Sequence, residues 1–70
     1  HAALFELSVR EEWVGKSLME LNLRKKYGIN VVAIRQAEDV SVAVDPAAPL
    51  TAVQKLVVIA DTDKLRKLKG

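Results

Sequence analysis

Two short runs of apolar residues constrain the fold of this chain most: residues 29–34, INVVAI, and residues 55–60, KLVVIA. Val and Ile dominate both runs, and these β-branched side chains favour extended backbone. A strand with one face in water alternates apolar and polar residues, whereas a continuous apolar run is typical of a strand covered on both faces. The sequence therefore predicts two central strands, and each needs cover on both faces.

Two further segments predict flanking strands. Residues 3–9 (ALFELSV) alternate between apolar and polar side chains except at Leu4, as expected for an edge or half-buried strand. Residues 40–45 (VSVAVD) alternate in the same way. Pro46 and Pro49 end this second segment, because proline has no N–H to donate to a ladder.

Helical segments are predicted between the first two strands and at the C-terminus. Ser17 and Glu20 have the spacing of a capping box, and Gly28 suits the left-handed position that ends a helix. Asn22 offers a second cap inside this segment, so one helix or two short ones both fit. One of residues 61–63 is expected to cap a basic closing helix that carries Leu65 and Leu68.

The element order is therefore β-α-β-β-β-α, an α+β module with helices packed on a mixed four-stranded sheet. The helical first connection allows the strands that it joins to run parallel, and the short later connections favour antiparallel neighbours. The chain has 70 residues and no cysteine. Since so small a core is marginal, we expect dimerisation to stabilise it. A face of residues 29–34 that the helices leave open is available to a partner copy.

Composition excludes several classes of protein. No apolar run approaches the ~18 residues that a membrane helix needs, and the start lacks the pattern of a signal peptide. The absence of cysteine fits the cytosol. His1 stands in place of an initiator methionine, so we interpret it as a tag remnant and residues 2–70 as one domain of a longer protein.

Few residues suggest chemistry. The serines and threonines lack a histidine base apart from His1, so we expect no enzyme. Residues 24–26 (RKK) suit a solvated helix end, and the net charge of +2 without interleaved aromatic residues argues against nucleic acid. Arg35 ends a buried strand, where it either binds a phosphate or only closes the strand.

The segment VGKSLMELNLRKKYGINVVAIRQ, residues 14–36, resembles the signature region of the TrkA C-terminal domain, also called RCK_C. The motifs V-G-K-S-L, L-N-L-R-K-K-Y-G and I-N-V-V-A-I-R follow one another with the family's spacing. Asp45-Pro46 and residues 56–68 (LVVIADTDKLRKL) also resemble the family's last strands and closing helix. The resemblance covers nearly the whole chain.

This resemblance implies a homodimeric regulatory domain of a Ktr- or Trk-type gating subunit, cytoplasmic and peripheral to a membrane potassium transporter subunit. From the hydropathy and charge described above, we also expect no direct membrane insertion and no nucleic-acid partner. The resemblance also implies cyclic di-AMP as a ligand at the dimer seam, with NAD or ATP/ADP only in an absent upstream lobe and no metal. The ligand-binding residues carried over from the family are Ile29, Val32, Ala33, Ile34, Arg35, Ala37, Ser41 and Pro46.

Two alternatives to ligand sensing remain open at this stage. The domain could be a purely structural dimerisation lobe of a channel or exchanger. It could also sense a divalent cation through the turn carboxylates of Glu11, Glu12, Glu38 and Asp39, although neighbouring carboxylates in a turn usually point apart into water.

Overall fold

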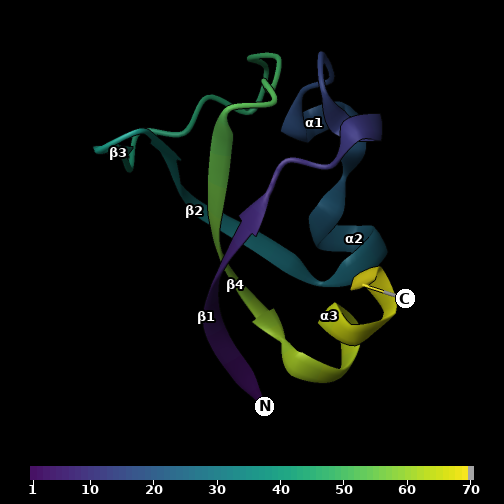
Figure 1. Ribbon diagram of the computed structural model, residues 1–70. Helices are drawn as coiled ribbons and strands as arrows, with labels where there is room; N and C mark the ends of the chain where they lie inside the picture. Colours follow the sequence, from purple (N-terminus) through teal and green to yellow (C-terminus); the bar gives the residue numbers. More distant parts are fainter. Residues whose placement is uncertain (70) are drawn as a thin grey trace.

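The computed structural model of this protein describes residues 1–69. It shows an open sheet with helices packed on one face (Figure 1). The predicted order of strands and helices is confirmed. Along the chain the elements are β1 (Ala2–Ser8), the 3₁₀ turn η1 (Glu11–Trp13), α1 (Leu18–Leu21), α2 (Leu23–Tyr27), β2 (Ile29–Gln36), β3 (Asp39–Ser41), β4 (Gln54–Asp61) and α3 (Thr62–Lys69).

The sheet order is β1-β4-β2-β3, and every pairing in it is antiparallel. The prediction of a mixed sheet is therefore wrong. β1 and β2 do run in the same direction, as a helical connection permits, but β4 lies between them and pairs antiparallel with both. The last long strand separates the two strands that the sequence suggested as neighbours.

The core lies between the sheet and the helices. On the inner face of the sheet, Leu56 and Val58 of β4 are fully buried, and Ile29 of β2 is 1% exposed. The other buried apolar side chains of this core come from β4, the helices, η1 and the loops. They are Val9, Trp13, Leu23, Leu50, Ala60 and Leu65. Leu65 thus confirms the predicted inner side of the closing helix, whereas the side chain of Leu68 lies outside the described part.

The opposite, outer face of the sheet is not covered by any element of the described chain. Leu4 of β1 is 65% exposed and Ile59 of β4 is 41% exposed, and these two residues lie directly opposite each other in the ladder. Val32 interrupts the pairing of β2 with β4 as an extra residue and is 38% exposed. The sequence predicted cover on both faces of the central strands, and residues 1–69 provide it on the inner face only.

The segment before β2 forms two helices rather than one. Asn22 adopts a left-handed conformation with φ 49° and separates α1 from α2. The Ser17 hydroxyl caps α1, because it accepts a hydrogen bond of 3.2 Å from the Glu20 N–H and donates one of 3.2 Å to the Glu20 carboxylate. Gly28 ends α2 at φ 67°, as predicted.

The cap of the closing helix is Asp61. Its Oδ1 accepts hydrogen bonds from the N–H groups of Asp63 at 2.8 Å and Lys64 at 3.4 Å. These bonds satisfy two of the donors that the start of α3 leaves without helical partners.

β3 ends at Ser41, so the prediction of a strand over residues 40–45 is wrong beyond that point. The chain that follows forms backbone bonds to the segment before α1 and to the first turn of α1. The Leu50 N–H donates to the Lys16 carbonyl at 2.9 Å, the Gly15 N–H donates to the Leu50 carbonyl at 2.8 Å, and the Met19 N–H donates to the Pro46 carbonyl at 2.9 Å. These long-range bonds draw the loop away from β2, which the local alternation of residues does not reveal.

Shortening a side chain on the inner face of the sheet should destabilise the domain far more than shortening a side chain in a loop. We expect Leu56→Ala to lower the free energy of unfolding by about 2–5 kcal/mol, because it removes a fully buried side chain and leaves a cavity. Val53→Ala, at a side chain 66% exposed in the loop before β4, should have little effect. Urea unfolding followed by circular dichroism measures both, and equal losses would contradict this account of the core.

Candidate functional site

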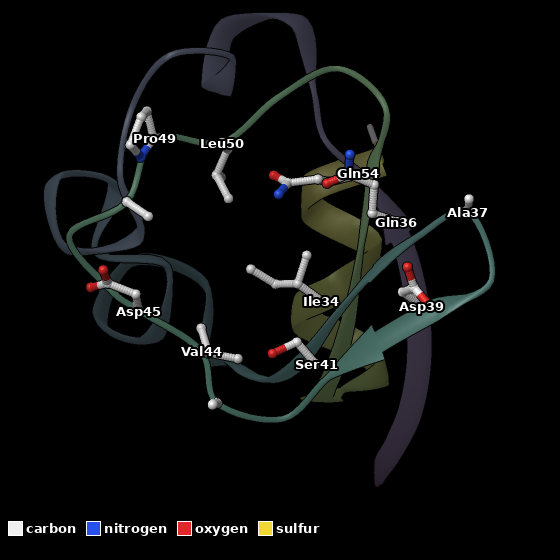
Figure 2. Close-up of a pocket in the computed structure, with 12 residues that line it drawn as sticks. Ile34, Gln36, Ala37, Asp39, Ser41, Val44, Asp45, Pro49, Leu50 and Gln54 are labelled. Carbon is white, nitrogen blue, oxygen red and sulfur yellow. The ribbon is translucent and has the colours of Figure 1, made fainter.

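A cavity of about 550 Å³ opens between the inner side of the β2–β3 hairpin and the loop that leads to β4 (Figure 2). Its size is in the range of small-molecule sites. The residues that line it come from β2, β3 and this loop: Ile34, Gln36, Ala37, Asp39, Ser41, Ala43, Val44, Asp45, Ala48, Pro49, Leu50 and Gln54.

The hairpin register places the strand residues of this cavity. Ile34 lies opposite Ser41, and Gln36 lies opposite Asp39, so all four side chains share the inner face of the sheet. Ala37 forms the tight turn between the strands with φ 56°, a conformation that residues other than glycine rarely adopt. The opposite wall is held by the backbone bonds of Leu50 to the segment before α1.

The chemistry of the cavity is mixed. Ile34, Val44 and Leu50 provide apolar surface, while Gln36 and Gln54 add amides and Asp39 and Asp45 add carboxylates. A flat heterocycle with N–H donors on its edge matches such walls. The carboxylates make the same space unfavourable for a phosphate group, since like charges repel.

A second cavity of about 410 Å³ lies against α1, α2 and the first half of β2. Val44 lines both cavities, so the loop after β3 separates them. The residues around the second cavity are Leu18, Met19, Asn22, Leu23, Arg24, Ile29, Asn30, Val31, Val44 and Pro46.

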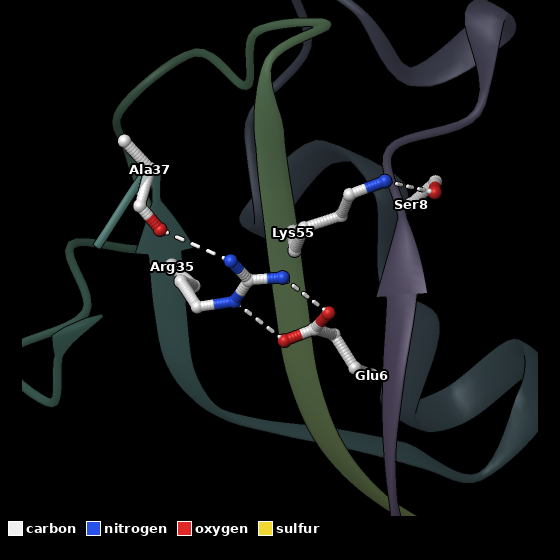
Figure 3. A network of polar contacts seen from close by, with 5 residues as sticks. All are labelled: Glu6, Ser8, Arg35, Ala37 and Lys55. Atoms are coloured by element: carbon white, nitrogen blue, oxygen red, sulfur yellow. Dashed lines mark hydrogen bonds and ion pairs between the residues drawn. The ribbon is translucent and has the colours of Figure 1, made fainter. Parts of the chain in front are cut away.

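Arg35 lies on the outer face of the sheet, away from both cavities. Its side chain crosses β4 to reach Glu6 of β1, with Nε 2.7 Å from one carboxylate oxygen and Nη2 2.5 Å from the other (Figure 3). The remaining Nη1 donates to the Ala37 carbonyl at 3.0 Å. Because Ala37 also lines the first cavity, the guanidinium sits just behind its rim.

This pair changes the acidity of both partners. The hydrogen bond from Arg35 holds the pKa of the Glu6 carboxyl below its usual value, and the Arg35 charge adds to this effect. In return, the hydrogen bond and charge of Glu6 raise the pKa of Arg35. The Arg35 guanidinium is therefore already paired with an anion, the Glu6 carboxylate.

The structure divides the eight predicted ligand-binding residues among three places. Ile34, Ala37 and Ser41 meet in the first cavity, and Ile29 and Pro46 lie at the second. The other three, Val32, Ala33 and Arg35, line neither cavity.

Sequence reasoning missed Leu50, Gln36 and Gln54 in the first cavity, and it missed Glu6 as the partner of Arg35. Leu50 and Gln54 belong to an irregular loop and to the start of a strand, where no local pattern marks a binding residue. Glu6 lies 29 residues from Arg35, so only the sheet order brings them together.

Two absences concern the described part of the chain only. Within residues 1–69 there is no group of three or more His, Cys, Asp or Glu side chains that could hold a metal ion. The four turn carboxylates of the cation-sensor alternative are thus not gathered into such a group. No helix in the same residues is long and apolar enough to cross a membrane.

Comparison with known families and structures bears on all of these observations. A family model described as the TrkA-C domain matches residues 3–70. A search of curated proteins finds no match.

Among solved structures, the regulator of conductance of K⁺ (RCK) C domain of the potassium transport protein KtrA, in complex with cyclic diadenosine monophosphate, has a TM-score of 0.88 at 26% identity. The match covers 99% of this chain and 81% of that one. An RCK_C domain dimer of S. agalactiae BusR in complex with cyclic di-AMP has a TM-score of 0.78 at 29% identity, and the match covers 96% of this chain and 85% of that one.

Longer proteins contain the same fold. The GsuK RCK domain has a TM-score of 0.82 at 23% identity, which supports the fold alone, and this chain spans 15% of it. BusR in complex with its promoter DNA is also similar, and this chain spans 34% of that protein. The expectation of no nucleic-acid partner is therefore untested for any longer protein that contains this domain.

The Glu6–Arg35 pair should add stability only where Glu6 is ionised. Since the folded pKa of Glu6 is lowered, its contribution is complete above the pKa of the unfolded chain, about 4.3, and is lost as the pH falls through the folded value. We expect Glu6→Gln to lower the melting temperature at pH 7 and to have no effect at a pH below both values. Glu38→Gln, in the exposed β2–β3 turn, is the control. A loss in Glu6→Gln that does not depend on pH would contradict this role of the ion pair.

Proposed function

Because this chain belongs to the TrkA-C domain family, we propose that it is a regulatory domain of a potassium-transport protein and binds cyclic di-AMP where two copies meet. The observation that carries the proposal is its likeness to the KtrA domain in complex with this dinucleotide, at 26% identity and a TM-score of 0.88 over 99% of the chain. The role is one of binding and regulation rather than catalysis.

The first cavity suits the adenine base of the ligand. Its apolar surface, from residues such as Ile34 and Leu50, can pack against the faces of a flat ring. The exocyclic amine of adenine can donate to the amide oxygen of Gln36 or to a carboxylate of Asp39 or Asp45. Such polar groups are few and specific, which favours one orientation of the base.

Arg35 suits the phosphate of the same ligand. Ala37 connects the first cavity with Arg35, because it lines the cavity and its carbonyl accepts a hydrogen bond from the Arg35 guanidinium. A ligand with its base in the cavity and its phosphate at the rim of the turn would reach both. The Arg35 fork, now engaged by two oxygens of Glu6, can hold two phosphate oxygens in the same manner.

Cyclic di-AMP has two equivalent halves, so a dimer related by a two-fold axis can hold one base in each protomer. Such a ligand changes the distance between the protomers only if it binds one dimer arrangement more tightly than another. In the longer protein, that difference would reach a membrane potassium transporter subunit from the cytoplasmic side. NAD or ATP/ADP would bind an upstream lobe and not these residues.

A second candidate is a purely structural dimerisation lobe. The observation that favours it is the Glu6–Arg35 pair itself, because the guanidinium already has an anionic partner and needs no ligand. In that case the cavity would be a by-product of the loop path and would stay empty in the presence of cyclic di-AMP.

Calorimetric titration with cyclic di-AMP tests the proposal. We expect one ligand per dimer, and we expect Arg35→Ala to weaken binding about tenfold or more, because a charge-assisted bidentate contact is lost. Arg24→Ala is the matched control, since Arg24 lines the second cavity. No heat from the wild-type dimer would favour the structural lobe, and a loss confined to Arg24→Ala would move the ligand to the second cavity.

Removing the Glu6 carboxylate should strengthen ligand binding, the opposite of removing Arg35. We expect Glu6→Gln to bind cyclic di-AMP several-fold more tightly than the wild type, because the phosphate no longer competes with a carboxylate for Arg35. The same titration measures this gain, with Glu38→Gln as the control. Weaker binding by Glu6→Gln would instead show that Glu6 orients Arg35 for the ligand.

A further inference from the structure

Gln54, the first residue of β4, closes the turn before this strand with both its backbone and its side chain. Its backbone N–H donates to the Thr51 carbonyl at 3.3 Å. In return, the Thr51 N–H donates to Oε1, the side-chain oxygen of Gln54, at 2.9 Å. Because the NH₂ group of an amide cannot accept this bond, the Thr51 N–H fixes which end of the Gln54 amide is the oxygen.

The same amide lines the first cavity and has hydrogen-bonding groups to spare. Gln54 is half-buried and lies opposite Gln36 in the β2–β4 ladder, and Figure 2 shows both side chains at one side of the cavity. Within the described residues, Nε2 of Gln54 donates to no acceptor. Oε1 keeps a second lone pair beside the one that binds Thr51. A ligand in the cavity therefore meets a donor and an acceptor in a fixed order.

This order matches one edge of adenine. The exocyclic amine of adenine donates, and each of the ring nitrogens that flank it, N1 and N7, accepts, so one glutamine amide can bind both groups at once. We infer that Gln54 forms this pair, with Nε2 donating to a ring nitrogen and Oε1 accepting from the amine, and so selects adenine over guanine. The inference rests on the proposed function and adds to it the residue that distinguishes the base.

Guanine does not match the Gln54 amide in this orientation. Guanine has a carbonyl oxygen where adenine has the amine, and this oxygen would face the lone pairs of Oε1. A glutamine without other bonds can turn its amide over and place Nε2 against the carbonyl. In Gln54 that rotation would break the bond from Thr51 and leave the NH₂ group facing the Thr51 N–H, donor against donor. The turn before β4 therefore holds the amide in the orientation that suits adenine.

The other polar groups of the cavity do not provide this discrimination. Within the described residues, no hydrogen bond fixes the side-chain amide of Gln36, so it can turn to suit either base. The carboxylates of Asp39 and Asp45 accept from the amine of adenine, but they accept equally from the N–H groups of guanine. These three residues can bind the second N–H of the adenine amine, whereas the choice of base depends on Gln54.

Calorimetric titration with cyclic di-AMP and with its guanine counterpart, cyclic di-GMP, tests the inference. We expect the wild type to bind the adenine form tenfold or more tightly than the guanine form. Gln54→Glu keeps an oxygen for the Thr51 N–H but loses the NH₂ donor, so the turn should stay closed while the ratio of the two affinities falls tenfold or more. Gln54→Met removes both groups without adding a charge and should also lower the ratio.

Val53→Glu is the control for the added charge. Val53 is 66% exposed and precedes Gln54 without lining the cavity, so a carboxylate there should leave the ratio of affinities unchanged. Far-ultraviolet circular dichroism checks that each variant is folded, and the wild-type ratio tests the inference without any substitution.

The ratio of affinities separates recognition of the base from a merely structural role of Gln54. If the Gln54 variants weaken both dinucleotides equally, the residue only closes the turn, and the inference fails while the proposed function stands. A wild type that binds both dinucleotides equally would overturn the inference in the same way, as would a Val53→Glu variant that lowers the ratio as far as Gln54→Glu. A wild type that binds neither dinucleotide would overturn the proposed function and the inference with it.

Discussion

The pairing of β4 with strands on both sides is the constraint on which the rest of this structure depends. β4 forms antiparallel ladders with β1 and with β2, and it contributes the fully buried Leu56 and Val58 to the core. Because a domain of this size buries little apolar surface, these two fully buried side chains make the central strand important for its stability. The helices, the hairpin and the loop are all positioned relative to this strand.

The central position of β4 also gives the sheet two faces with different uses. Its inner side chains are buried against the helices, whereas its outer side leaves Ile59 exposed and lets Arg35 of β2 reach Glu6 of β1. The turn at Ala37 connects the two sides, since Ala37 lines the first cavity and accepts a hydrogen bond from Arg35. A ligand at this turn would contact the β2–β3 hairpin at the residue that hydrogen-bonds to Arg35 of the ion pair.

Local chemistry predicted those parts of the fold that short-range interactions decide. The Ser17 cap, the left-handed Gly28 and the four strands follow from residues that are close in sequence. The mixed sheet was wrong because strand neighbours depend on which distant segments pair. The length of β3 was wrong because the loop after it bonds to residues 15–19, a competition that alternation alone cannot show. For the candidate site, Ile34, Ala37 and Ser41 were brought to one cavity, but the walls from Leu50 and Gln54 were not foreseen.

By itself, the sequence determined that this chain is an α+β module with two apolar central strands, short capped helices and the motifs of the TrkA-C family. These properties depend on backbone preference, on capping and on the spacing of apolar residues, all of which act over a few positions. Only the tertiary structure decided that Arg35 carries Glu6, that the predicted ligand residues divide among three places, and that Leu4 and Ile59 share an uncovered face. Each of these depends on the sheet order, because β4 lies between β1 and β2, two strands that come much earlier in the sequence.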